Sequence, residues 1–298
     1  MNIMNLINAM PGAVAQGLIW GIMAIGVYIT YRVLDVADLT VDGSITTGGV
    51  VCVMMMLAGY PAWTSMLGAL AAGMLAGLVT GLLHTAMGIP ALLSGILTQL
   101  SLYSINLRIM QKSNQSISVD KYDLLVSLRY IMPAIAVCAV LVVVIIAVLY
   151  WFFGTSLGCS IRATGANPNM SRAQGINVNV TKIIGLMISN GLVALSGALL
   201  SQYNGFADVK MGIGAIVIGL AAVIIGDVIF GKFFLNFASK LLAVVFGAII
   251  YYMVLQIVFW FGLNSDYLKL LTAVIVAVFL AIPYWKSEYF SKPVKRGE

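Results

Sequence analysis

The sequence predicts an all-α protein, built as a polytopic bundle of membrane-spanning helices. Of its 298 residues, 61% are hydrophobic and only 9% are charged. Its mean hydropathy is +1.04. Several apolar runs approach or exceed the ~20 residues with which a helix crosses a bilayer. The runs are continuously apolar, whereas barrel strands alternate over about ten residues, so helices are favoured over a barrel.

About nine runs are expected to cross the bilayer. In chain order they are residues 13–31, 43–58, 63–87, 91–106, 130–153, 183–203, 215–230, 241–261 and 268–285. The second run is short and follows a polar stretch, so it is expected to be a discontinuous span. Residues 1–285 would then form a single membrane domain, and residues 286–298 are too polar to insert and form a tail.

Glycines in the first and third runs predict close helix packing. Gly73, Gly77 and Gly81 repeat every four residues, and Gly17 and Gly21 do the same in the first run. A helix face without side chains lets a neighbouring helix approach closely. Packing within one chain is favoured over a dedicated dimer face.

Acidic residues mark the approach to the second run. Asp35, Asp38 and Asp42 are three and four residues apart, so a helix would place them on one face, with Arg32 one turn earlier. Carboxylates near membrane depth cost free energy and indicate function. Gly43 interrupts the pattern.

Beyond this interruption, Asp42 or Ser44 is expected to cap a half-helix that begins near Ser44. Discontinuous helices of this kind build substrate sites in transporters, which makes Asp38, Thr40, Asp42 and Ser44 candidates for lining a substrate pathway. The structural alternative has Asp42 as a cap, Asp38 paired with Arg32, and Asp35 facing cytoplasmic water. A proton relay is the least favoured use of these carboxylates.

Two polar residues in later runs complete the candidate pathway. Gln99 lies in the fourth run and Asn190 well inside the sixth. A buried amide must form hydrogen bonds, so Asn190 either bonds a neighbouring helix or lines a cavity.

A polar, basic island, Arg162–Ile176, stands out in this apolar chain. Asn167 and Pro168 form a good helix start, because asparagine caps free N–H groups and proline is tolerated in the first turn. Gly175 is a good stop, since glycine adopts the left-handed conformation after a last helical residue. The spacing predicts a short helix of about two turns within a cytoplasmic loop, residues 154–182.

The placement of lysine and arginine predicts the orientation, because these residues concentrate in cytoplasmic loops. With the tail inside, ten of the sixteen basic residues face the cytoplasm: Arg32, Arg162, Arg172, Lys182, Lys232, Lys240, Lys286, Lys292, Lys295 and Arg296. Four others do not fit, since the polar loop 107–128 and its flank would lie outside: Arg108, Lys112, Lys121 and Arg129. An odd number of crossings places the N-terminus outside.

Other patterns predict no catalytic or metal site. Residues 226–232 fit the phosphate-loop spacing, but Phe233 stands where serine or threonine would hold magnesium, and an apolar span precedes it. His84 is the one histidine in the sequence. The three cysteines lack metal-ligand spacing. The net charge of +6 is attributed to cytoplasmic loops and not to nucleic acid.

Three blocks in order carry a family resemblance. The island segment G-A-N-P-N-M-S-R-A-Q-G-I-N-V (165–178) resembles the coupling loop of ABC importer permeases of the branched-chain amino acid and ribose type. The block A-D-L-T-V-D-G-S (37–44) is similar to the one that opens the broken second span of sugar permeases, and the glycine-rich segment 211–226 is similar to the family's span after the coupling loop. Met170 and Ser171 depart from the family pattern, where small alanines are common.

The resemblance implies a bacterial inner-membrane permease that hydrolyses nothing itself. Its partners would be ABC ATPase subunits carrying ATP and magnesium, an extracellular binding lipoprotein, and a second copy of the permease. The ATPase-coupling residues implied are Arg162, Gly165, Asn167, Pro168, Arg172 and Gly175. The T-V-D-G-S form resembles a subgroup proposed to carry aromatic amino acids. Branched-chain amino acids, a sugar or nucleoside, and an ion-coupled carrier without an ATPase stay open as alternatives.

Overall fold

The computed structural model describes residues 3–118, 121–231 and 233–260, together with 270, 272–274, 276–278 and 281. This part of the chain contains eleven helices and two three-residue strands, β1 (Asn114–Ser116) and β2 (Phe206–Asp208). Five of the described helices are long and apolar enough to cross a membrane: Ile7–Val33, Ala62–Thr85, Ile131–Gly154, Val178–Asn204 and Phe237–Trp260. The prediction of an apolar helical bundle is therefore confirmed, and the number of crossings stays a prediction.

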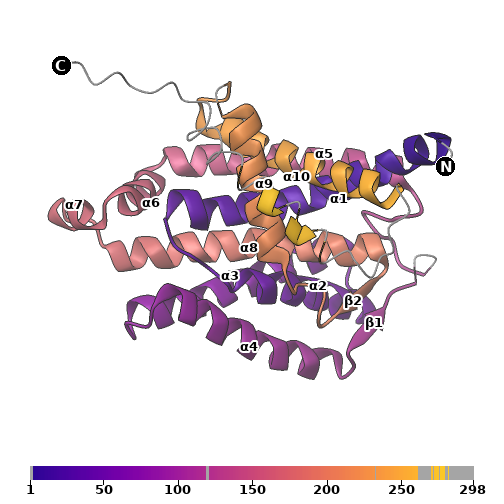
Figure 1. The fold of residues 1–298 in the computed structure, drawn as a ribbon. Coiled ribbons are helices and arrows are strands. Elements are labelled where there is room, and N and C mark those ends of the chain that lie inside the picture. The colour runs from indigo at the N-terminus through magenta and orange to yellow at the C-terminus, as the bar shows by residue number, and fades with distance from the viewer. Residues whose placement is uncertain are drawn as a thin grey trace, which may run out of the picture.

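Two helices form the centre of the bundle, α1 (Ile3–Tyr28) and α8 (Val178–Asn204). Their most apolar windows are 83% and 78% buried, against 28–44% for the other three long helices. The outer helices α3 (Ala62–Thr85), α5 (Ile131–Gly154) and α10 (Phe237–Trp260) surround them (Figure 1). An apolar face left open on an outer helix suits contact with lipid chains.

Glycines set the closest helix contacts, as the sequence predicts. A Cβ added at Gly73, Gly77 or Gly81 of α3 would meet the backbone of α8. Gly17 and Gly21 of α1 lie in the same way against Ile249 and Val245 of α10. These contacts join helices within one chain.

The second span differs from the expectation. A π-helical turn, η1 (Ile29–Val33), ends the first span, and α2 (Val41–Leu57) begins only after non-helical residues. Asp35 has a left-handed backbone with φ of 54°. Because the helix is broken between η1 and α2, the three aspartates do not share a helix face, and the expectation that they do is wrong. The interruption also precedes Gly43, which lies inside α2.

The remaining helices are α4 (Ala91–Met110), α6 (Ser156–Ala166), α7 (Pro168–Ala173) and the short α9 (Ala215–Phe230). Helix α4 runs four residues past its predicted end, and α6 was expected as part of a loop. Figure 1 shows α6 and α7 at one end of the bundle, and the N-terminus with β1 and β2 at the opposite end.

The two strands pair antiparallel, with Asn114 opposite Asp208, and neither was expected. Most of the ninth predicted run and the whole tail 286–298 lie outside the described residues.

Candidate functional site

A buried polar network surrounds Asp38, which is only 4% exposed. Its Oδ2 accepts a hydrogen bond of 2.7 Å from Asn190 Nδ2, and its Oδ1 accepts one of 2.9 Å from the Thr40 backbone N–H. Ser44 Oγ donates to Asn190 Oδ1 over 2.6 Å. A carboxylate removed from water needs such partners. The structure thus brings four predicted pathway residues into one network, and Asn190 bonds neighbouring segments as expected.

Hydroxyl groups extend this network to two more helices. Thr40 Oγ1 lies 2.7 Å from Thr80 Oγ1 of α3, which bonds Thr98 Oγ1 of α4 over 2.9 Å. Thr80 and Thr98 were not predicted from the sequence. A threonine in an apolar helix commonly bonds its own backbone, so its position alone does not indicate a contact between helices.

Asp42 has a role different from the one expected. Its carboxylate accepts hydrogen bonds of 2.9 Å from the backbone N–H groups of Gly214 and Ile216. It therefore caps the N-terminus of α9, where free N–H groups and the helix dipole favour a negative charge. The prediction that Asp42 or Ser44 caps its own half-helix is wrong, because α2 begins at Val41 without a side-chain cap.

Gln99, the last predicted pathway residue, lies half-buried on α4. Its Cα is 3.2 Å from the position that a Cβ would take at Gly43. Gln99 thus lies at the contact between α2 and α4, against Gly43.

The short helix α7 has the predicted ends. Asn167 Oδ1 accepts a hydrogen bond of 3.0 Å from the Met170 N–H, and Pro168 is the first helical residue. Gly175 follows the helix with φ of 81°, and the Ile176 N–H bonds Ser171 O over 3.0 Å. Arg172 is exposed, and so are Asn167 and Pro168. The helix thus presents an exposed polar surface at its end of the bundle.

Helix α6 connects α7 to the interior. Gly165 packs on the backbone of Val33 and Leu34, so a side chain at Gly165 would collide with η1. Thr164 Oγ1 lies 2.9 Å from Thr181 Oγ1 of α8. A displacement of α6 would therefore reach both η1 and α8. The predicted coupling residues Arg162 and Gly165 belong to this helix and not to α7.

Arg32 forms an ion pair with Asp227, at 3.0 Å from Nε and 2.7 Å from Nη2 to Oδ2. The pair joins η1 to the last turn of α9. The structural alternative expected Arg32 to pair with Asp38. That expectation is wrong, because Arg32 pairs with Asp227 instead. The signal missed in the sequence was a lone carboxylate in an apolar run, which normally has a partner.

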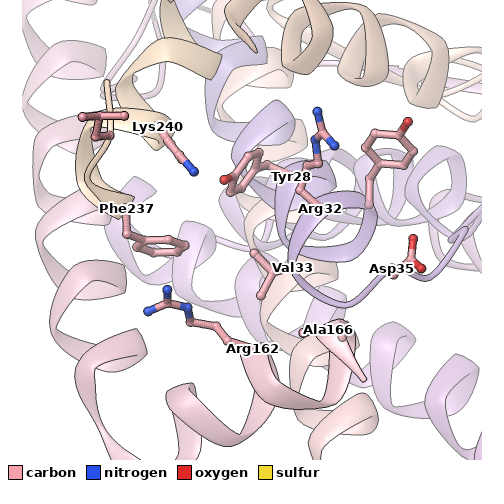
Figure 2. Close-up of a pocket in the computed structure, with 11 residues that line it drawn as sticks. Tyr28, Arg32, Val33, Asp35, Arg162, Ala166, Phe237 and Lys240 are labelled. Carbon is pink, nitrogen blue, oxygen red and sulfur yellow. The ribbon is translucent and has the colours of Figure 1, made fainter. Parts of the chain in front are cut away.

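A cavity of about 380 Å³ lies at the α6 end of the bundle, between η1, α6 and the start of α10. Figure 2 shows Arg162, Lys240 and Tyr28 pointing into the space around Phe237. The Arg162 guanidinium lies 5.7 Å from the centre of the Phe237 ring.

A larger cavity, about 670 Å³, lies toward the opposite end, beside β2 and the N-terminus of α9. The rings of Trp20 and Tyr252 in its wall are 5.9 Å apart and tilted by 37°. Asp208 and Lys210 add opposite charges to the lining. The remaining polar and aromatic lining residues are Gln16, Asn204, Phe206, Gln256, Phe259 and Thr272. We call this cavity, at the end of the bundle away from α6 and α7, the outer cavity. It was not predicted from the sequence, and it offers aromatic surfaces beside both signs of charge.

Within the described residues, no three His, Cys, Asp or Glu side chains group as a metal site would require. His84 Nδ1 lies 2.9 Å from Ile89 O, and its Nε2 lies 3.2 Å from Lys182 Nζ. These two contacts are typical of a polar side chain at the end of a helix.

Comparison with known proteins gives a consistent likeness. A family described as "Branched-chain amino acid transport system / permease component" matches residues 10–282. A "Tyrosine transport system permease protein" of Clostridioides difficile (strain R20291) is 43% identical over 269 residues, 89% of this chain and 88% of that protein. An "Autoinducer 2 import system permease protein LsrC" of Yersinia pestis (strain Pestoides F) is 30% identical over 209 residues, 70% of this chain and 58% of that protein.

A solved structure described as "PsaBC from Streptococcus pneumoniae in complex with Fab" has a TM-score of 0.54. The match covers 96% of this chain and 100% of that chain at 15% identity. At 15% identity, the likeness shows a similar fold only.

Proposed function

The chain belongs to the permease components of the branched-chain amino acid transport system type, and from this we propose that it carries an aromatic amino acid across the membrane. It is the permease subunit of an ABC transporter and not an enzyme, since ATP hydrolysis in such transporters lies in separate subunits. The observation that carries the proposed solute is the 43% identity to a tyrosine transport permease.

The outer cavity supports an aromatic amino acid. Its volume of about 670 Å³ falls in the range of small-molecule sites, which combine apolar walls with a few polar groups. The faces of Trp20 and Tyr252 suit an aromatic side chain. Asp208 and Lys210 suit the ammonium and carboxylate of an amino acid.

The proposed mechanism starts at α7. Closure of two ATPase subunits pushes on residues 167–174 of each of two permease copies. Helix α6 passes this displacement to η1 through the Gly165 contact, and to α8 through Thr164 and Thr181. The segment carrying Asp38 follows η1 directly, so the buried network changes together with the coupling helix. An extracellular binding protein delivers the solute at the far end.

This mechanism places α6 and α7 in the cytoplasm of a bacterial cell, with the N-terminus outside. Arg162, Arg172 and Lys182 lie on or beside these helices, which agrees with the excess of basic residues in cytoplasmic loops. Accessibility of single cysteines to an impermeant reagent on whole cells tests the orientation. A cysteine at Lys112 is expected to react and one at Arg172 is not.

Gly175→Val tests the coupling helix. Valine at φ of 81° is strained, since β-branched residues avoid the left-handed region. We expect α7 to lose its end, and uptake with binding-protein-stimulated ATPase activity to fall at least tenfold, while the protein still inserts. The measurement is tyrosine uptake and ATPase activity of the reconstituted complex.

Gly88→Val is the matched control, because Gly88 also has a positive φ, of 70°, with open space around it, but lies between α3 and α4. The two variants carry the same kind of strain in different loops. Wild-type coupling in Gly175→Val, or equal losses in both variants, would exclude the proposed docking role of α7.

Co-purification and uptake of different solutes test the alternative functions. Under the proposal, the chain co-purifies with an ATPase subunit and takes up tyrosine in preference to leucine and ribose. Uptake driven by an ion gradient without ATPase would instead establish the ion-coupled carrier. Preference for ribose would favour a sugar permease, in line with the likeness to the autoinducer 2 permease.

A further inference from the structure

Two cavities meet at the α6 end of the bundle. The first, of about 380 Å³, is the basic cavity shown in Figure 2. The second, of about 450 Å³, lies at the end of α5 and is lined by Tyr150, Trp151 and Phe153. Arg162 and Phe237 line both of them. The basic cavity and the aromatic cavity therefore lie side by side at Arg162 and Phe237, and the two are together called the hollow.

The positive charge of this hollow is not neutralised by the described residues. Arg32 is engaged by Asp227, whereas no ion pair involves Arg162 or Lys240 among the described side chains. Asp35 also lines the basic cavity, but Figure 2 shows it on the far side, away from both groups. Two cations thus converge beside the Tyr28 hydroxyl without a described counter-ion, an arrangement that attracts an anion.

The aromatic half of the hollow has the features of a membrane–water boundary. Tyr150 and Trp151 are 58% and 72% exposed, and the apolar residues before them on α5 include Val148, which is 56% exposed. Tyrosine and tryptophan gather where a bilayer's polar headgroups begin. The exposed side of α5, which suits contact with lipid chains, therefore lies next to the basic cavity.

We infer that this hollow binds one anionic phospholipid. Its phosphate lies between Arg162 and Lys240, and its acyl chains extend past Tyr150 and Trp151 along α5. Basic pockets between helices near the membrane surface are suited to such headgroups. A soluble anion or an acidic protein surface would use the cations but would leave the adjoining exposed aromatic surface unused, so the adjacency of the two cavities favours a lipid.

Native mass spectrometry of the full-length protein tests the site. In a mixture of phosphatidylglycerol and phosphatidylcholine with identical acyl chains, we expect at least a fivefold preference for phosphatidylglycerol. The double variant Arg162→Gln/Lys240→Gln should reduce this preference to below twofold. The matched control, Arg108→Gln/Lys112→Gln, removes two exposed cations at the opposite end and should keep the preference. An unchanged preference in the first variant, or no preference in the wild type, overturns the proposal.

Two further experiments distinguish a lipid phosphate from free phosphate and control for misfolding of the variants. An excess of inorganic phosphate should not displace phosphatidylglycerol, and complete displacement would mean that the site binds phosphate alone. In the wild type, brominated phosphatidylglycerol should quench tryptophan fluorescence more than brominated phosphatidylcholine does. That difference should vanish in Trp151→Phe, and its persistence would place the lipid elsewhere.

Discussion

Three aspartates within eight residues show how surroundings decide what one side chain does. Asp35 is exposed, Asp38 is enclosed by Thr40 and Asn190, and Asp42 caps a helix more than 170 residues later in the chain. An exposed carboxylate is solvated by water. The two enclosed ones depend on donors from other segments, so their removal leaves those donors unpaired.

Replacing Asp42 with asparagine measures its cap. The amide has one acceptor oxygen where the carboxylate has two, so either the Gly214 or the Ile216 N–H loses its partner. We expect the free energy of unfolding in detergent to fall by about 1–3 kcal/mol. Asp35→Asn is the control and should change it by less than about 0.5 kcal/mol, as at most exposed positions. Equal effects in the two variants would contradict the assigned cap.

The residues that could be predicted were those whose partners are close in sequence. Asn167 and Gly175 form the ends of α7 through bonds to residues three to five positions away. Asp38 and Asn190 could be recognised as buried polar groups in need of partners, but 152 residues separate them, so their pairing could not be predicted. Asp227 likewise meets Arg32 only through the fold.

At the scale of elements, the membrane makes long helices easy to predict and short ones hard. The bounds of α3 and α5 agree with the expected runs to within two residues, because a continuous apolar run has to cover the bilayer. Helix α6 was missed because its apolar residues are interspersed with glycines and polar side chains. The strands β1 and β2 have three residues each and pair across the chain, which leaves no periodic signal.

Gly77→Ala tests the packing of α3 on α8. The added Cβ would meet backbone atoms of Leu186 and Met187, which cannot rotate away. Overpacking of this kind costs about 1–3 kcal/mol, and we expect that loss in thermal or denaturant unfolding. Gly154→Ala, at the end of α5, is the control, because nothing lies within 4 Å of its added Cβ. If both variants were equally stable, the two helices would have to be further apart than described.

At the scale of the whole molecule, the proposed coupling helices α6 and α7 and the outer cavity lie toward opposite ends of the bundle (Figure 1). Two connections lie between them. The first is the Asp38 network, which comes directly after η1 in the chain. The second is the Arg32–Asp227 ion pair, which joins η1 to the C-terminal end of α9. Asp42 caps the N-terminal end of α9, beside the outer cavity. Both connections start at η1, the segment that α6 contacts through Gly165. Coupling between distant sites requires an element with two arrangements that both sites influence, and η1 with α9 is the proposed one.

The Arg32–Asp227 pair provides the test of this connection. Its side chains are 54% and 25% exposed, so the pair contributes only about 0–1 kcal/mol to stability. Asp227→Asn should therefore leave the unfolding temperature nearly unchanged, yet it should lower tyrosine uptake per ATP hydrolysed, because α9 no longer follows η1. The exchanged pair Arg32→Asp/Asp227→Arg should recover part of the loss, which neither single variant can do. Arg108→Gln controls for the loss of a charge and should transport normally. Uptake per ATP at the wild-type level in both single variants would show that the pair transmits nothing, and the coupling would then have to pass through the contacts of α6 with α8.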